Sequence, residues 1–199
     1  MFKRKCKITF ITHGATVHSM DGILSDSEKF PKINDIGEEE IEKVCEYLTK
    51  RGVHYDKIYT SSSTRCTQSA QIVAKLFKKR ITTIDLPPRK LGEWSGQSFN
   101  DIYDEFGADS ISMTPKGGEE LKEFNKRVCE VINKLVDENI GNRIVVVTTP
   151  DVVQAAIALT LNLTPENQFK NLVKTGSLTQ ISYFVDDWSS VIYSDYIPM

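Results

Sequence analysis

Three short segments of this 199-residue chain carry side chains that can attack or hold an anion: Thr12-His13-Gly14, Ser61 to Arg65, and Thr148-Thr149-Pro150. A neutral imidazole is a nucleophile, and a guanidinium can hold a phosphate or carboxylate through two parallel hydrogen bonds. Each segment is a weak signal by itself. A histidine at the end of a strand is commonly satisfied by local hydrogen bonds, and an arginine in a first helical turn is commonly a surface residue.

Each segment directly follows a run of residues typical of a buried strand. The predicted strands are Lys7 to Thr12, Lys57 to Thr60, Arg143 to Val147 and Ser177 to Phe184, with Val191 to Tyr193 adding an edge. Apolar residues at three- and four-residue steps predict helices over Gly37 to Lys50, Thr64 to Lys78, Asn100 to Phe106 and Gly118 to Asn139. A further helix begins at Thr149-Pro150-Asp151, where an N-cap residue, a first-turn proline and a first-turn acid stand together.

Strands that alternate with helices predict an α/β fold, a three-layer α/β/α sandwich with a mostly parallel central sheet. We expect one domain over residues 1–199, because no stretch has the composition of a linker. Residues 86–118 contain Pro87-Pro88 and several glycines and are expected to form an excursion from the sheet. In open α/β sheets, sites form at the carboxyl ends of the strands, so the three segments are expected to meet there.

Composition excludes several classes of protein. The chain has a formal net charge of −2, a pI near 6.0, and 40% hydrophobic and 26% charged residues, values typical of a globular domain. Scattered basic residues argue against nucleic-acid binding, and no apolar run approaches the roughly 20 residues of a membrane span. Four dispersed cysteines, Cys6, Cys45, Cys66 and Cys129, predict reduced, buried thiols and no zinc site. We therefore expect a cytoplasmic protein without a metal.

Four groups of residues, in this order, resemble the histidine phosphatase superfamily, also called phosphoglycerate mutase-like. They are Ile11-Thr12-His13-Gly14-Ala15-Thr16 with Asn34-Asp35-Ile36-Gly37, then Tyr59 to Ala70, then Leu91-Gly92-Glu93-Trp94-Ser95-Gly96, then Pro115-Lys116-Gly117-Gly118-Glu119 followed by Phe124 and Arg127. The resemblance implies the phosphoglycerate mutase-like fold and a phosphoryl-transfer pocket that uses neither a metal nor a cofactor. It implies His13 as the phosphoryl acceptor and Arg65, with Gly14, Thr12 and Thr149 around it, as the phosphate-binding group.

The chain departs from the family pattern at three chemical positions. Thr12 stands where the family has its first arginine, and Thr149 where it has its second histidine. Pro88 occupies the usual position of the acid that protonates the leaving group. Losing one preorganised donor typically costs about a hundred- to thousandfold in rate, although such losses are not additive within one catalytic unit.

Three residues are candidates to replace the missing groups: Glu93 as an acid, His18 as a second histidine, and Asp151 as a base. Each also has an ordinary structural interpretation, as a solvated loop residue, a surface loop residue and a helix-terminus residue respectively. Trp94 is interpreted as a packing anchor of the excursion, and His54 is given no role because it lies at the amino end of a strand.

Two hypotheses about function follow. The first is a protein of this fold with an eroded catalytic centre, which binds a small phosphorylated molecule or another anion, or a protein partner, in a regulatory role. The second is an active, divergent phosphomonoesterase that hydrolyses a small phosphorylated metabolite through a phosphohistidine at His13. If the chain is active, a phosphatase is favoured over a mutase because the excursion is short.

Overall fold

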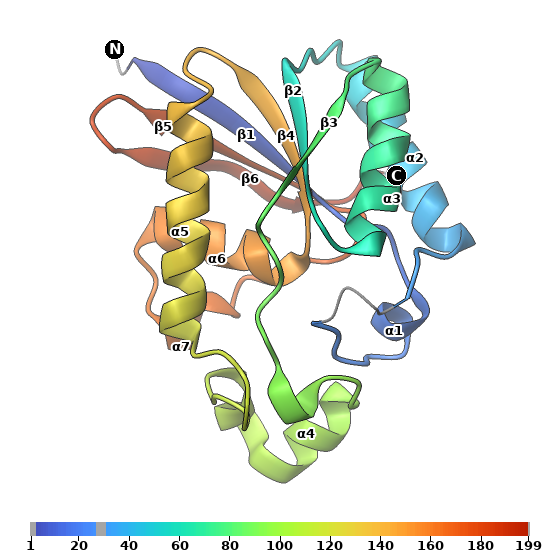
Figure 1. Ribbon diagram of the computed structural model, residues 1–199, viewed down its shortest axis with the longest axis vertical. Coiled ribbons are helices and arrows are strands. Elements are labelled where there is room, and N and C mark those ends of the chain that lie inside the picture. The colour runs from blue at the N-terminus through green and yellow to red at the C-terminus, as the bar shows by residue number, and fades with distance from the viewer. Residues whose placement is uncertain (1–2, 27–30, 199) are drawn as a thin grey trace.

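Six strands form one sheet in the computed structural model, which describes residues 3–26 and 31–198 (Figure 1). Their order across the sheet is β3-β2-β4-β1-β5-β6. The bounds are β1 Arg4–Thr12, β2 Lys57–Ser61, β3 Ile81–Ile84, β4 Arg143–Thr148, β5 Leu178–Phe184 and β6 Ser189–Tyr196. β3, β2, β4 and β1 run parallel, whereas β5 and β6 pair antiparallel. The predicted mostly parallel α/β sheet is confirmed.

The three candidate segments lie together because of the strand register. Thr12 at the end of β1 pairs with Thr148 at the end of β4, and Val147 of β4 pairs with Thr60 of β2. The Ser61 hydroxyl lies 2.8 Å from the Thr148 hydroxyl, which ties the ends of β2 and β4 directly. Parallel strands end at the same edge of a sheet, so three strand-to-helix turns open onto one place.

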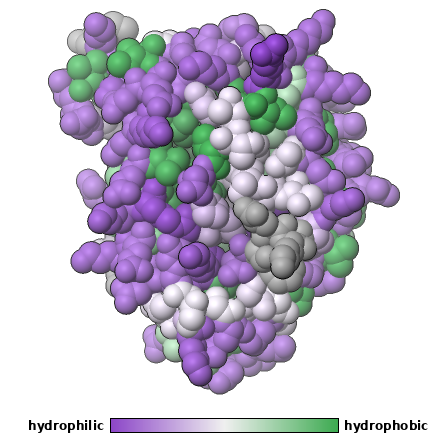
Figure 2. All heavy atoms as spheres, in the orientation of Figure 1, coloured by the Kyte–Doolittle hydropathy of each residue, from purple (hydrophilic) through white to green (hydrophobic). Residues whose placement is uncertain are grey.

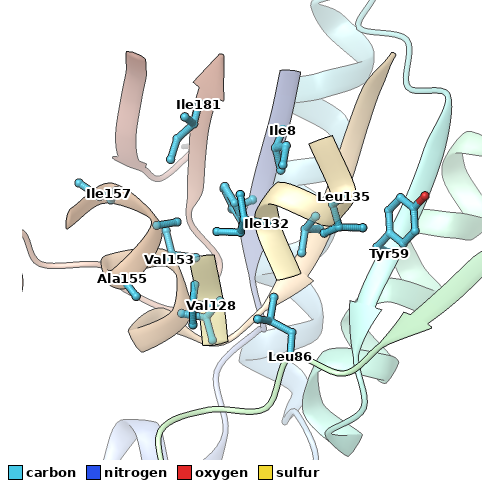
Figure 3. Packing of buried hydrophobic residues seen from close by; sticks show 14 of the residues in the cluster. Ile8, Tyr59, Leu86, Val128, Ile132, Leu135, Val153, Ala155, Ile157 and Ile181 are labelled. Carbon is cyan, nitrogen blue, oxygen red and sulfur yellow. The ribbon is translucent and has the colours of Figure 1, made fainter. Parts of the chain in front are cut away.

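Helices cover both faces of the sheet. The longer ones are α2 Asp35–Lys50, α3 Thr64–Phe77, α4 Phe99–Phe106, α5 Leu121–Asp137 and α6 Pro150–Leu161, with short helices α1 Val17–Met20 and α7 Pro165–Gln168. One hydrophobic cluster joins one face of the sheet to α5 and α6, and a second joins the other face to α2 and α3. Figure 3 shows the first cluster, with Ile8 of β1, Val128, Ile132 and Leu135 of α5, and Val153 of α6.

Strand β4 is buried on both faces, which explains its continuously apolar sequence. Ile144 and Val146 belong to the first cluster and Val145 and Val147 to the second, and all four are fully buried. A strand covered on both faces has no side that tolerates polar residues.

The segment between β3 and α5, which includes residues 86–118, contains no strand of the sheet. It holds a 3-10 helix Gly92–Trp94, then α4, then a second 3-10 helix Gly107–Ile111. Figure 1 shows α4 beyond the carboxyl ends of the strands. Arg127 of α5 anchors its start by donating to the carbonyl oxygens of Pro87 and Pro88 at 2.8 Å each.

Some local expectations were wrong. Strand β3 was not predicted, because its middle residues Thr82 and Thr83 are exposed and only four residues pair. Strand β6 is longer than the predicted Val191 to Tyr193. Of the four cysteines, all free, Cys129 is only partly buried.

The surface view in Figure 2 is mostly hydrophilic, with hydrophobic residues in separate small groups. Among residues 3–26 and 31–198, no helix combines the length and the apolar character that a membrane crossing requires.

Candidate active site

A cavity of about 320 Å³ opens at the carboxyl ends of β1, β2 and β4. Its lining includes the side chains of His13, Arg65, Arg89, Thr149, Asp151 and Gln154. The structure therefore brings together four residues singled out from the sequence, His13, Arg65, Thr149 and the candidate base Asp151.

His13 is held rigidly at the end of β1 and is only 5% exposed. Its amide donates to the Thr148 carbonyl at 2.9 Å, and its carbonyl accepts from the Gly176 amide at 3.0 Å. Its Nδ1 lies 2.9 Å from the Gly14 carbonyl oxygen. Because a carbonyl only accepts, Nδ1 carries the proton, and the lone pair is on Nε2.

Burial lowers the pKa of His13 to about 3, and the nearby Arg65 guanidinium contributes in the same direction. The desolvation of a buried imidazolium and the repulsion of a like charge both favour the neutral ring. At neutral pH, His13 is therefore an uncharged imidazole, the form in which Nε2 can act as a nucleophile.

Gly14 fixes the position of His13 through a close backbone contact. A Cβ atom on Gly14 would lie 2.2 Å from the Gly37 carbonyl oxygen at the start of α2, so only glycine fits. The Gly14 amide donates to the Ser69 hydroxyl at 3.0 Å, and Gly14 does not line the cavity. Its place in the structure is therefore that of a packing residue beside the histidine.

Arg65 reaches the cavity from the first turn of α3. Its side chain is buried, its Nη2 donates to the Ser25 carbonyl at 2.9 Å, and its Nε has no hydrogen-bond partner. A buried N–H without a partner costs free energy, so a ligand oxygen that accepted from Nε would remove that cost.

Thr149 occupies the N-cap position of α6, but its side chain makes no capping hydrogen bond. Its Oγ1 is buried and has no partner. The N-terminal end of a helix carries partial positive charge, and here it faces the cavity together with an unused hydroxyl. Both features favour an anionic ligand.

Asp151 lies in the first turn of the same helix and brings a carboxylate into the cavity. Its Oδ2 accepts from the Arg89 backbone amide at 2.7 Å. Arg89 follows Pro88, so the Asp151 carboxylate lies against the loop where the family resemblance places an acid. This proximity was not visible from the sequence, since 62 residues separate the two partners.

Thr12 is buried but does not line the cavity. Its Oγ1 lies 2.6 Å from the Lys174 carbonyl, to which it donates, and accepts from the Ser177 amide at 2.8 Å. These bonds tie the end of β1 to the turn before β5. The Thr12 side chain therefore bonds to the backbone and does not line the cavity.

The other candidates lie apart from the cavity. Glu93 is exposed on the 3-10 helix of the excursion, and His18 lies with its Nδ1 2.6 Å from the Ser25 hydroxyl, outside the lining. His54 is exposed, with its Nε2 3.9 Å from an Asp56 carboxylate oxygen. Trp94 is buried in the excursion beside Phe106, as expected of a packing anchor.

Arg89 was missed by the sequence reasoning. It is buried, and its Nε and Nη2 donate to the carbonyls of Glu119 and Met113 at 2.8 Å each. Its position in the sequence, directly after Pro87-Pro88 and beside the position expected for an acid, could have identified Arg89 as a candidate. Within residues 3–26 and 31–198, no group of three or more His, Cys, Asp or Glu side chains is arranged to hold a metal ion.

Comparison with known proteins agrees with this geometry. A family profile described as histidine phosphatase superfamily (branch 1) matches residues 8–195. The chain is similar to a broad-specificity phosphatase from Saccharomyces cerevisiae, with 30% identity over 139 residues. That match covers 66% of this chain and 59% of the yeast protein, so the chain spans less than two thirds of that relative's length.

Two further similarities extend over more of the chain. A 2,3-bisphosphoglycerate-dependent phosphoglycerate mutase from Thermoplasma acidophilum is 29% identical over 177 residues, which are 86% of this chain and 84% of the mutase. A solved structure of a phosphoserine phosphatase from Entamoeba histolytica, in complex with 3-phosphoglyceric acid, superposes with a TM-score of 0.83 at 20% identity. It covers 96% of this chain and 97% of that one, which establishes the shared fold.

Proposed function

Since the chain belongs to branch 1 of the histidine phosphatase superfamily, we propose that it binds a phosphate monoester around His13 and Arg65 and hydrolyses it slowly or not at all. On this proposal it is a phosphatase-like binding or regulatory protein. One observation carries it: the cavity keeps an imidazole and a guanidinium, while Thr12, Pro88 and Thr149 stand where the family resemblance expects an arginine, an acid and a histidine.

The binding half of the proposal is supported by two unused donors. Arg65 Nε and Thr149 Oγ1 are both buried without a partner and belong to side chains that line the cavity. A phosphate in the cavity would lie beside these two side chains and next to the N-terminus of α6, and a guanidinium and a helix N-terminus both favour an anion. The Asp151 carboxylate repels an anion, but its Oδ2 already accepts a hydrogen bond from the Arg89 amide.

The slow-turnover half is supported by the shortage of charge-stabilising groups. In phosphoryl transfer, cationic donors neutralise the oxygens whose charge shifts in the transition state. Two missing donors at about a hundred- to thousandfold each would lower the rate by about 10⁴ to 10⁶ if they acted independently, and by less within one cooperative unit.

The ligand class is also part of the proposal. The solved relative from Entamoeba histolytica is in complex with 3-phosphoglyceric acid, and other relatives are named phosphoglycerate mutases. We infer for this chain a small phosphorylated metabolite, bound without a cofactor.

The test measures binding and turnover separately. Calorimetric titration with inorganic phosphate is expected to show binding to the wild type and at least tenfold weaker binding to Arg65→Gln, because a charge-assisted pair of donors is lost. The matched control is Arg80→Gln, which removes an exposed arginine just before β3, at the amino end of the strands. No binding to the wild type, or equal binding to Arg65→Gln, would contradict the binding half.

Turnover of para-nitrophenyl phosphate tests the other half. We expect kcat below about 0.1 s⁻¹, at least a hundredfold under a typical enzyme value of about 10 s⁻¹. A kcat near the typical value that disappears in His13→Ala would overturn the claim of impaired catalysis.

The alternative is an active, divergent phosphomonoesterase, and a specific observation favours it. His13 presents a neutral Nε2 to the cavity, and the Asp151 carboxylate lies against the loop that follows Pro88. In that reaction Nε2 bonds to phosphorus as the ester P–O bond breaks, and the departing oxygen takes a proton from Asp151 in its acid form. Water then attacks phosphorus and gives a proton to the Asp151 carboxylate as the P–N bond breaks, which releases phosphate and neutral His13 and restores the acid form.

Mass spectrometry of the protein under turnover, kept at alkaline pH, distinguishes the two proposals. A phosphohistidine on His13 that is absent from His13→Asn supports the active alternative. Absence of any adduct with several phosphomonoesters supports the binding protein.

A further inference from the structure

A second cavity adjoins the one that contains His13. It has a volume of about 270 Å³, and the two cavities share a wall that includes Leu24, Leu91, Phe99 and Phe169. Its remaining lining includes Trp94 and Ile102, which are buried, and Leu172, which is 70% exposed. The wall comes from distant parts of the chain: the segment after α1, the excursion with α4, and the segment after α7, which lie beyond the strand ends in Figure 1.

The polar side chains of this second cavity are already bonded to the protein backbone. Arg89 donates to the carbonyls of Glu119 and Met113. Gln154 Nε2 donates to the Asn171 carbonyl at 3.0 Å, and the Ser110 hydroxyl donates to the Gly107 carbonyl at 2.6 Å. The rest of the lining is aliphatic and aromatic: Leu24, Leu91, Trp94, Phe99, Ile102, Phe169 and Leu172.

This arrangement selects against a polar ligand group. A hydroxyl moved from water onto the aliphatic and aromatic part of this wall would lose its hydrogen bonds and find few replacements. An apolar group would instead cover exposed hydrophobic surface, including Phe99, which is 40% exposed. Removing apolar surface from water stabilises a complex.

We propose that the second cavity binds the organic part of the ligand, and that this part is an apolar or aromatic group, while the phosphate lies at Arg65 in the first cavity. The proposal rests on the function proposed above, because it needs a phosphate site to orient the ligand. It narrows the ligand class to phosphate monoesters with a hydrophobic substituent, in contrast to sugar phosphates and phosphoglycerates.

The test compares three probes by isothermal titration calorimetry: 1-naphthyl phosphate, glycerol 2-phosphate and inorganic phosphate. We expect the wild type to bind 1-naphthyl phosphate at least tenfold more tightly than glycerol 2-phosphate. We expect Phe99→Ser and Leu172→Ser, both at exposed positions, to reduce that preference at least threefold each. Leu172 lines only the second cavity, so Leu172→Ser should leave the affinity for inorganic phosphate unchanged. Ile140→Ser is the matched control, because Ile140 is exposed near the start of β4, at the opposite end of the sheet.

The outcomes separate the two proposals. Equal affinity for the two esters, with inorganic phosphate bound through Arg65, overturns the apolar subsite and leaves the phosphate site standing. A naphthyl preference unchanged in both serine variants also overturns the subsite. Binding of 1-naphthyl phosphate that does not weaken in Arg65→Gln overturns the orientation proposed here, and no binding of any probe overturns both proposals.

Discussion

Replacing Thr149 by histidine tests whether the site lacks a cationic donor at that position. Thr149 lines the cavity, and its Oγ1 has no hydrogen-bond partner. The substitution therefore breaks no side-chain hydrogen bond, and the threonine side chain makes no capping bond to α6 that would be lost. The new imidazole would face the same 320 Å³ cavity as His13.

The expected gain follows from the value of one preorganised donor in phosphoryl transfer. Such a donor contributes about a hundred- to thousandfold in rate, which corresponds to about 2.7 to 4 kcal/mol of transition-state stabilisation. Because Thr12 and Pro88 would still be in place, and because effects within one catalytic unit are not additive, we expect the lower figure. Thr149→His should raise kcat for para-nitrophenyl phosphate about a hundredfold.

The assay follows release of para-nitrophenol by wild type, Thr149→His, and the double variant Thr149→His with His13→Ala. The double variant should fall to the buffer background, because the gain requires the nucleophile. Thr49→His, at an exposed position near the end of α2, is the matched control and should leave the rate unchanged. A folded Thr149→His variant that binds inorganic phosphate normally yet shows no rate increase would refute the reasoning that a donor is missing there.

Two further predictions concern the residues that hold the site in place. Burial holds the pKa of His13 at about 3 against an ordinary value of 6.5, so the unfolded chain binds more protons than the folded one below pH 6.5. His13 should therefore contribute a loss of about 1 kcal/mol of stability per pH unit as the pH falls from 6 to 4, measured by urea unfolding as the difference between wild type and a His13 variant. His13→Asn should show a smaller loss, and an identical slope would contradict the assignment. Gly37→Ala should destabilise the protein by about 2 to 4 kcal/mol, because its Cβ would lie 2.3 Å from the Ala15 carbonyl oxygen. A urea midpoint equal to that of the wild type would show that the backbone beside His13 can yield.

The elements around the site were predictable from local patterns. Continuous apolar runs predicted β1, β2 and β4, and the helical periodicity of α2, α3 and α5 gave ends within three residues of those observed. Such patterns can be recognised in a short stretch of sequence, because the buried face of a strand or helix is made of its own apolar side chains. β3 escaped prediction because an edge strand of four residues, half of them exposed, carries little of that signal.

The contents of the cavity were predictable only in part. His13 and Arg65 stood out because each follows a strand, and parallel strands end at one edge. The hydrogen-bond partners of the side chains at the cavity could not be predicted from the sequence. The carbonyl that accepts from Arg65 belongs to Ser25, and the amide that donates to Asp151 belongs to Arg89.

The sequence by itself determined the α/β order, predicted the candidate site at the strand ends, and showed that Thr12, Pro88 and Thr149 differ from the residues expected from the resemblance. Only the tertiary structure decided the direction of the Thr12 and Thr149 side chains. Thr12 turns toward a segment 162 residues away, whereas Thr149 keeps an unpartnered hydroxyl at the cavity. The physical reason is that a buried polar group must find a hydrogen-bond partner wherever the fold supplies one, and residues distant in sequence decide where that is.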